Sequence, residues 1–260
     1  MKLRLYQVDA FASRVFAGNP AAVVPLERWL DDATLQAIAT ENNLSETAFF
    51  VGGGGEYHIR WMTPADEVDL CGHATLASAF VIFSEIEAGR AEVRFRSKSG
   101  PLRVSAEGER LALDFPSRPP EPADASLEAL AAALGRKPTA ALASRDYMAV
   151  FGSEEEVRSL RPDMARVAAL DRMAVIATAP GRDCDFVSRF FAPAVAVPED
   201  PVTGSAHCTL VPYWARRLGK GSLFARQVSA RGGELWCEDR GARVTLAGHA
   251  VTFLRGKIEV

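Results

Sequence analysis

Short segments in which hydrophobic and polar residues alternate account for much of the chain. Leu3 to Val8 and Tyr57 to Met62 show this two-residue period, which is typical of strands with one buried face. A helical period separates them, because Leu35, Ile38 and Ala39 recur on one face. The pattern predicts a protein built mainly from strands, with few helices.

Two further helices stand out because of their composition. The helix predicted from His73 to about Ile86 has small residues on one side and large apolar residues on the other, so it is expected to be almost fully buried. The second, from Cys208 to Leu218, is amphipathic and follows a glycine turn at Gly204. We expect an α+β fold in which each half is a largely antiparallel sheet wrapped around one buried central helix.

Weak internal repeats divide the chain into two halves. Arg60-Trp61-Met62-Thr63-Pro64 matches Arg189-Phe190-Phe191-Ala192-Pro193 about half a chain length later, and Gly72 matches Gly204 at nearly the same offset. The segment Pro116 to Asp124 holds four prolines and is the best candidate for a linker. We therefore predict halves at residues 1–118 and 119–260, with the last strand free to pack back on the first half. The two glycine turns are expected to face each other across a shared cleft.

Composition narrows the class of partner. The 260 residues are 48% hydrophobic and 24% charged, with a net charge of −3 and dispersed Lys and Arg, so neither nucleic acid nor an anionic membrane is indicated. The four cysteines show no C-x-x-C spacing, and we expect reduced thiols. With no long apolar run and no leader-like segment in view, we expect a cytoplasmic protein that acts on a small molecule.

The glycine turns are candidate anion sites. The first amides of a helix lack intrahelical partners, and the helix dipole favours a carboxylate there by about 0.3–1 kcal/mol when exposed. Gly72 and Gly204 would let such a helix begin tightly, and Thr203 and Ser205 could bind a carboxylate or cap their own helix. The alternative is an ordinary turn from strand to helix.

Glu46 is the most informative single residue. It precedes the apolar run Ala48 to Val51, and desolvation shifts a carboxyl pKa upward, towards the range useful in proton transfer. A solvated glutamate at the start of a strand is the alternative. The repeat places Arg172 opposite Glu46, so the proposed base has no twin, and a one-base proton shuttle is favoured over a two-base one.

Facing turns would also bring His73 and Asp200 towards one ligand. A neutral imidazole at a helix start can donate or relay a proton, although capping and packing remain alternatives. Cys71 is a candidate nucleophile or acid/base thiol because the same dipole would lower its pKa. A two-thiol racemase needs a second cysteine at the facing turn, which is absent, and Cys208 is expected in the core. The four histidines lack metal-ligand spacing, so no metal site is predicted.

Several motifs together resemble the phenazine-biosynthesis PhzF-like isomerase family, along nearly the whole chain. These are Val8-Asp9-Ala10-Phe11, Phe16 with Gly18-Asn19-Pro20-Ala21-Ala22-Val23, Asn42-Asn43-Leu44-Ser45-Glu46-Thr47-Ala48-Phe49, Asp69-Leu70-Cys71-Gly72-His73-Ala74-Thr75, Glu199-Asp200-Pro201-Val202-Thr203-Gly204-Ser205-Ala206-His207, and Arg226-Gln227-Val228-Ser229-Ala230-Arg231-Gly232-Gly233.

The resemblance implies a diaminopimelate-epimerase-like fold, a homodimer and no cofactor. It makes Glu46, His73 and Asp200 catalytic. It places substrate polar groups around Gly72, Gly204 and Ser205, and it puts Asn19 and Ser45 near the acid/base centre.

We therefore expect a cofactor-independent isomerase that moves a proton within a small, carboxylate-bearing, unsaturated or cyclic substrate, with Glu46 as acid/base. Two alternatives stay open. One is a racemase or epimerase that uses Cys71, and the other is a metabolite-binding or interaction protein without turnover.

Overall fold

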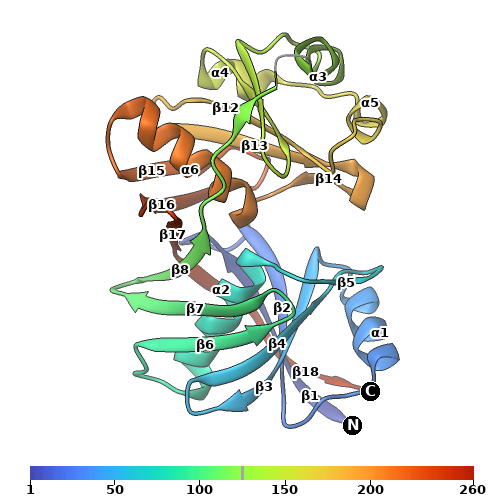
Figure 1. Ribbon diagram of the computed structural model, residues 1–260. Coiled ribbons are helices and arrows are strands. Elements are labelled where there is room, and N and C mark those ends of the chain that lie inside the picture. The colour runs from blue at the N-terminus through green and yellow to red at the C-terminus, as the bar shows by residue number, and fades with distance from the viewer. Residues whose placement is uncertain (124–125) are drawn as a thin grey trace. The chain divides into compact units, whose positions relative to one another are not determined.

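The computed structural model describes residues 1–123 and 126–260, and the chain forms two compact units (Figure 1). Unit 1 comprises Met1–Asp114 and Ala247–Val260, and unit 2 comprises Phe115–Leu246. Both are strand-rich α+β structures, as the hydrophobic pattern predicted.

Unit 1 is a sheet wrapped around one helix. Its elements are β1 (Lys2–Ala10), β2 (Asn19–Leu26), α1 (Asp32–Asn42), β3 (Glu46–Gly53), β4 (Glu56–Met62), β5 (Glu67–Val68), α2 (Gly72–Val81), the π-helical turn η1 (Ile82–Ile86), β6 (Glu92–Ser97), β7 (Gly100–Glu107), β8 (Arg110–Pro116), whose last two residues enter unit 2, and β18 (Ala250–Glu259). Helix α2 lies among the strands of this unit in Figure 1, and every residue from His73 to Ala79 is buried, as is Val81. The long buried helix was therefore predicted correctly, except that its last turn is π-helical.

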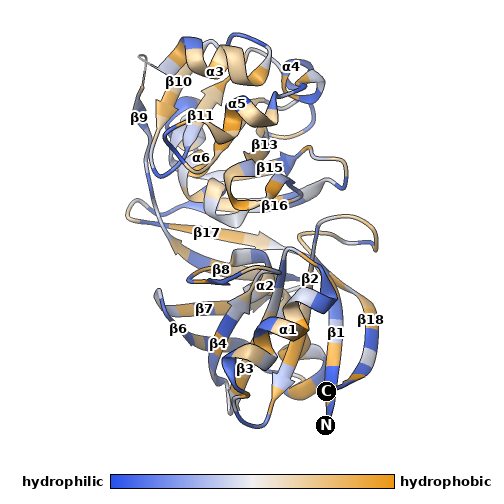
Figure 2. Ribbon diagram, turned by 90° about the vertical axis from the view of Figure 1, so that its right-hand side faces the viewer, coloured by the Kyte–Doolittle hydropathy of each residue, from blue (hydrophilic) through white to orange (hydrophobic). Residues whose placement is uncertain are grey.

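The strand pairs of unit 1 follow from its connections. Strands β1 and β2 form an antiparallel hairpin, while β2 runs parallel to β3 across α1, and β4 runs parallel to β6 across α2. The pairs β3–β4, β6–β7 and β7–β8 are antiparallel, and β18 pairs antiparallel with β1. Figure 2 shows hydrophobic and hydrophilic bands alternating along β1 and β18, which is the two-residue period of a pleated strand.

Helix α1 illustrates how local sequence fixes an element. The Asp31 side chain accepts a hydrogen bond from the Thr34 backbone N–H at 2.9 Å, and Asn43 ends the helix with a left-handed φ of 49°. Leu35 and Ile38 pack into the core, and each buried side chain of this size contributes about 1.5–3 kcal/mol. The cap and the apolar face define the same helix, and this helix was predicted correctly.

From β10 onward, unit 2 follows a similar order of elements, with two short helices in place of α1. It contains β9 (Glu121–Pro122), α3 (Leu127–Leu134), β10 (Ala140–Ala143), β11 (Tyr147–Val150), α4 (Glu154–Ser159), α5 (Met164–Ala168), β12 (Val175–Pro180), β13 (Phe186–Ala192), the 3-10 turn η3 (Pro193–Val195), β14 (Val197–Asp200), α6 (Gly204–Leu218), β15 (Ser222–Gln227), β16 (Gly233–Asp239) and β17 (Arg243–Gly248). The β10–β11 hairpin, the parallel pair β11–β12 and the parallel pair β13–β15 across α6 match β1–β2, β2–β3 and β4–β6 of unit 1. The duplication inferred from the sequence is thus present in the topology.

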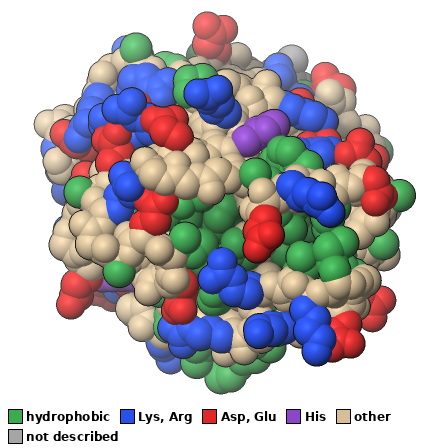
Figure 3. Space-filling view, turned by 90° about the horizontal axis from the view of Figure 1, so that it is seen from below, with side chains coloured by type: hydrophobic (Ala, Val, Ile, Leu, Met, Phe, Trp, Pro, Cys, Tyr) green, Lys and Arg blue, Asp and Glu red, His purple; other side chains and the backbone are tan. Residues whose placement is uncertain are grey.

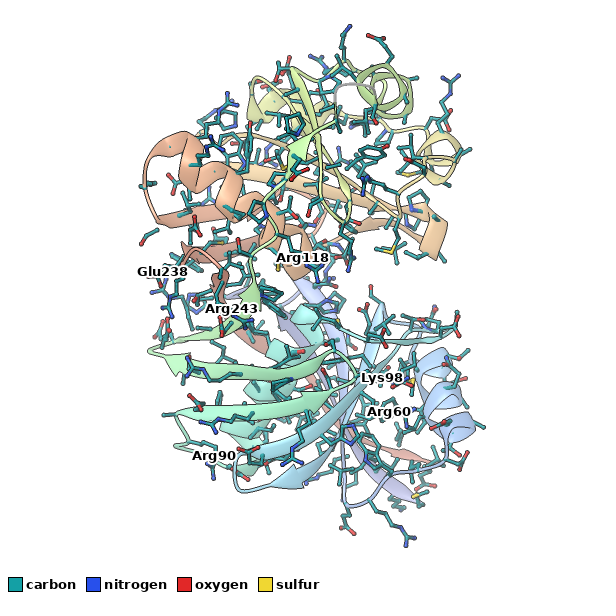
Figure 4. All side chains as sticks on the ribbon, in the orientation of Figure 1. Arg60, Arg90, Lys98, Arg118, Glu238 and Arg243 are labelled. Atoms are coloured by element: carbon teal, nitrogen blue, oxygen red, sulfur yellow. The ribbon has the colours of Figure 1, made fainter. Side chains whose placement is uncertain are left out.

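An arginine clamp repeats in both units. Arg60 on β4 donates two hydrogen bonds to Glu67 on β5, at 2.8 and 2.9 Å, and Arg189 on β13 donates two to Glu199 on β14, at 2.7 and 2.8 Å. Figure 4 labels Arg60 and Lys98, and Lys98, in the turn between β6 and β7, also binds Glu67, at 2.6 Å. Paired N–H bonds from one guanidinium fix the geometry of a carboxylate, so each clamp holds the strand that leads into the buried helix.

Strand registers correct one detail of the repeat. Thr47 lies opposite Met62, and Val175 lies opposite Phe191, which are equivalent positions of the matched segments. The residue equivalent to Glu46 is therefore Ala174 rather than Arg172, which precedes β12. The predicted absence of a twin for Glu46 holds, because alanine has no proton to exchange.

Two other expectations need correction or limits. Gly72 and Gly204 begin helices, but neither is among the described glycines with positive φ, so a left-handed turn does not explain glycine at these positions. The strand expected from Asp171 begins only at Val175. Within the predicted linker, Glu121–Pro122 form β9 and pair with β10, while its last residue, Asp124, lies outside the described residues.

Candidate active site

Three elements of unit 1 bring four predicted site residues together. Asn19 is the first residue of β2, Glu46 is the first residue of β3, and Cys71 and His73 lie at the start of α2. His73 Nε2 lies 3.1 Å from Glu46 Oε2, and the His73 side chain is 6% exposed while that of Glu46 is 18% exposed. The imidazole is therefore shielded, and the carboxylate is the more accessible member of the pair.

The other ring nitrogen of His73 determines where its proton lies. The Asn19 amide donates to Nδ1 at 3.2 Å, and the Cys71 sulfur lies 3.5 Å from the same atom. Because Nδ1 accepts a hydrogen bond, the proton of the neutral ring lies on Nε2, towards Glu46. The charged ring carries a proton on both nitrogens, so Nε2–H faces the carboxylate in both states, whereas Nδ1 accepts from Asn19 only in the neutral ring.

The charge of His73 differs from the sequence-based expectation. Burial by itself lowers the pKa of His73, but the charge of the adjacent Glu46 carboxylate opposes burial, and the pKa is raised above its usual value of 6.5. The expectation that the helix dipole keeps this ring neutral is therefore wrong. A carboxylate 3.1 Å away has more influence than partial charges at a helix end.

Cys71 also differs from its expected state. It is the N-cap residue of α2 and is buried, and burial together with the Glu46 charge raises the pKa of its thiol to about 11. The prediction of a lowered pKa is wrong, because desolvation outweighs the dipole. The thiol is therefore protonated at neutral pH.

Glu46, Cys71 and His73 could also hold a metal ion. One ligand atom from each residue lies within 4.8 Å of the other two. In the described part of the chain, these three residues form the one cluster of His, Cys, Asp or Glu side chains close enough to share a metal ion. Cys71 faces Nδ1 and Glu46 faces Nε2, so an ion bound to Cys71 and Nδ1 would leave Glu46 on the far side of the ring. The remaining predicted residues of unit 1, Ser45 and Gly72, adjoin Glu46 and His73 in sequence.

Unit 2 holds a second polar cluster at the start of α6. Asp200 ends β14, and its Oδ2 accepts a short hydrogen bond from the hydroxyl of Thr203, the N-cap residue. The Thr203 side chain therefore binds a carboxylate of its own chain and makes no cap hydrogen bond to α6. Gly204 and Ser205 are the first two residues of α6, and both follow this cluster directly.

Gln227 organises the cluster and was not singled out from the sequence. This residue ends β15 and is 1% exposed. Its Oε1 accepts from the Thr203 N–H at 2.9 Å, and its Nε2 donates to the Asp200 backbone oxygen at 2.8 Å and to the Thr203 hydroxyl at 3.1 Å. A signal was present, because Leu223, Ala225 and Gln227 form the inward face of a strand, where a polar residue needs a partner.

His207 and Cys208 lie deeper in α6. His207 is fully buried, its Nδ1 lies 2.8 Å from the Thr203 carbonyl oxygen, and burial lowers its pKa to about 4. Burial raises the pKa of the Cys208 thiol to about 11, and the expectation of a core thiol is confirmed. Both residues are neutral at physiological pH and pack within unit 2.

None of the helices in the described residues combines the length and apolar character that a membrane crossing requires.

Comparison with known proteins identifies the family. A sequence model of the phenazine biosynthesis-like protein family matches residues 8–256. The chain is 56% identical over 261 residues to an uncharacterised isomerase of Pseudomonas aeruginosa, with 100% of both chains covered. It is also 49% identical to a PhzF family protein from Enterococcus faecalis, whose crystal structure superposes with a TM-score of 0.97 over 100% of both chains.

A more distant structure supports the fold alone. The crystal structure of a hydroxyproline epimerase from Agrobacterium vitis is 10% identical, with a TM-score of 0.61 over 99% of this chain and 92% of that one. The expected diaminopimelate-epimerase-like α+β fold is therefore confirmed. With a family match along nearly its entire length, the chain belongs to the phenazine biosynthesis-like PhzF family and is an isomerase.

Proposed function

We propose that this isomerase moves a proton within a small, unsaturated or cyclic substrate that bears a carboxylate, with Glu46 as the acid/base group and no cofactor. The Glu46–His73 pair carries the proposal. The carboxylate is accessible at 18% exposure, and the imidazole behind it is shielded at 6%. This arrangement supports Glu46 as the base that contacts the substrate. It supports His73 as a residue that contacts Glu46 from the buried side.

The reaction needs one group that carries the proton and one conjugated system that takes up the electron pair. Glu46 removes a proton from a carbon made acidic by an adjacent unsaturated system, and the electron pair of the broken C–H bond spreads into that system. Glu46 then returns the proton to another carbon of the same substrate, so atoms and charge balance. A positioned acid/base group contributes typically about 10²–10⁴-fold in rate.

His73 has the proposed role of positioning Glu46. Its Nε2 lies 3.1 Å from the carboxylate in an ion-pair contact, and Asn19 and Cys71 contact the opposite nitrogen. The free amides at the start of α2 are suited to a substrate carboxylate or to developing negative charge.

In unit 2, Asp200 has a proposed catalytic role, and Thr203, Gly204 and Ser205 have a proposed role in substrate binding. Asp200 and Thr203 are fixed by Gln227, and Gly204 and Ser205 open the helix that follows. That these residues serve the same substrate as Glu46 stays a prediction, as does the homodimer. A double-mutant cycle between Glu46 and Asp200, read in kcat/KM, tests the shared substrate, because independent sites give additive effects.

The direct test is Glu46→Gln, with Glu41→Gln as the matched control on the exposed surface of α1. Candidate cyclic and unsaturated acids are incubated with each variant in heavy water, and deuterium uptake is followed by mass spectrometry. We expect Glu46→Gln to keep ligand binding and to lose turnover by about 10²–10⁴-fold, while Glu41→Gln exchanges deuterium like the natural protein. Full exchange by Glu46→Gln would refute the mechanism, and binding without exchange by the natural protein would indicate a metabolite-binding protein.

A racemase or epimerase that uses Cys71 is the second candidate. The observation in its favour is the 3.5 Å separation between Cys71 Sγ and His73 Nδ1. Two features oppose it, namely a thiol pKa of about 11 and the presence of Thr203 at the position of unit 2 equivalent to Cys71. A lone protonated thiol does not supply the pair of opposed bases that a two-thiol racemase uses.

A further inference from the structure

Unit 1 has a pocket at the end where β1 begins. Its volume is about 720 Å³, which is within the usual range for small-molecule sites, and its lining includes none of Asn19, Glu46, Cys71 and His73. The floor combines Leu26, Phe50 and Tyr57, which are buried, with half-buried Leu3, Leu30 and Ile86. Figure 3 shows this end of the unit, with hydrophobic side chains in a hollow and Lys and Arg side chains around it.

The charges around the pocket are predominantly positive. Lys2, Arg4, Arg28 and Lys257 line it, and Glu27 is the one acidic residue of the lining. Lys2 pairs with Glu259 at 3.0 Å. Among the residues that the structure describes, Arg4, Arg28 and Lys257 make no ion pair or side-chain hydrogen bond, so three cations at this pocket lack an anion.

Two of these cations are held close together by the sheet. Arg4 on β1 lies directly opposite Lys257 on β18 in the antiparallel register. Like charges at directly opposed positions destabilise a strand pair, and an anion between them would remove that cost. The position is therefore suited to a negatively charged group from outside the chain.

The floor has one fixed aromatic surface. The Tyr57 hydroxyl donates to Glu87 at 2.8 Å, and the ring meets Phe50 edge to face, with centroids 5.2 Å apart. Because the hydroxyl already has its partner, Tyr57 presents a ring to the pocket and needs no polar contact from a ligand. An apolar ligand body can therefore rest on this floor without leaving a polar group unpaired.

We propose that this pocket binds a small amphipathic carboxylate, with its head group between Arg4 and Lys257 and its apolar body over Phe50 and Tyr57. The site is separate from the acid/base pair, and the proposal is independent of the proposed function. A flexible alkyl carboxylate and a flat aryl carboxylate share this chemistry, and the choice between them depends on the shape of the floor.

The test uses decanoate and 2-naphthoate as the two probes, with butanoate and decanol as ligands that lack the apolar body and the charge, respectively. Binding is measured by calorimetry in low salt on the natural protein, on Arg4→Gln/Lys257→Gln, and on Arg14→Gln/Arg96→Gln. The last variant is a matched control, because it removes the same charge from exposed positions outside the pocket. Both variants change surface side chains, so folding is expected to be retained.

We expect at least one probe to bind the natural protein and the control equally, and to bind Arg4→Gln/Lys257→Gln about 10-fold more weakly. Higher salt should reduce this difference, because the charges are exposed to solvent. Equal affinity in the two double variants, or equal affinity for decanol and decanoate, would overturn the proposal. The proposal would also be overturned if no probe bound the natural protein and Arg4→Gln/Lys257→Gln changed the oligomeric state. The pocket would then be a contact between copies of the chain.

Discussion

Replacing Gln227 by leucine should damage both the stability of unit 2 and turnover. The side chain is 1% exposed and makes three hydrogen bonds to Asp200 and Thr203. Leucine has a similar volume but no polar atom, so the change removes these bonds and leaves little cavity. The effect therefore measures the polar contacts rather than the packing.

The magnitude follows from the partners that are left behind. The Thr203 N–H is buried and loses its acceptor, which costs about 1–3 kcal/mol, and each neutral hydrogen bond lost from the Gln227 amide nitrogen costs about 1 kcal/mol. Since such terms are not fully additive, we expect a total of about 2–4 kcal/mol. In urea this lowers the unfolding midpoint by about 1–2 M.

The assay combines unfolding with local exchange. Hydrogen exchange of the segment around Thr203 should accelerate most, because its amide proton is the one released. Gln36→Leu is the matched control, since Gln36 donates to the Thr63 carbonyl at 2.8 Å from a half-buried position that water can reach. If Gln227→Leu is no less stable than Gln36→Leu, the proposed role of Gln227 in fixing Asp200 and Thr203 is wrong.

Two further predictions concern the unit 1 site. Cys71→Ser should keep turnover within about 3-fold of the natural protein. The natural protein should also resist alkylation at neutral pH, because the pKa of the Cys71 thiol is about 11. A loss of turnover as large as that of Glu46→Gln would show that the thiol takes part in the reaction. His73→Gln should be less stable than the natural protein at pH below 6.5, and urea titrations over a pH series should show this difference shrinking as pH rises. The sign follows because the folded state raises the pKa of His73, so its contribution is complete below 6.5 and disappears as pH passes the folded pKa. A difference that does not change with pH would contradict the ion pair with Glu46.

Much of the scaffold could be predicted from local sequence. The apolar face of α1 and the burial of α2 depend on spacing within a few residues, and both were predicted. The duplication was also visible, because Arg60 and Arg189 keep the same role and each binds a carboxylate on the next strand. Short elements such as β5 and β9 were missed, since two residues leave no period to detect.

The chemistry of the site was harder to predict. Whether Cys71 and His73 are charged depends on Glu46, which is distant in sequence and lies 3.1 Å from the ring only after β3 and α2 have packed. Gln227 acts on residues 24 and 27 positions away, so its inward position on β15 indicates a need for a partner but not which residues are bound. The sequence thus predicted that Glu46 and His73 lie close together more easily than it predicted the protonation states of Cys71 and His73.

The repeated arginine clamp has an evolutionary consequence. Both copies of the ancestral segment still anchor the start of their helix in the same manner, yet the positions equivalent to Glu46 and His73 in the second copy hold Ala174 and Ser205. The backbone geometry is therefore shared by both copies, while the carboxylate–imidazole pair is present in only one. Substitutions near Ser205 in the second copy therefore leave the Glu46–His73 pair of the first copy unaltered.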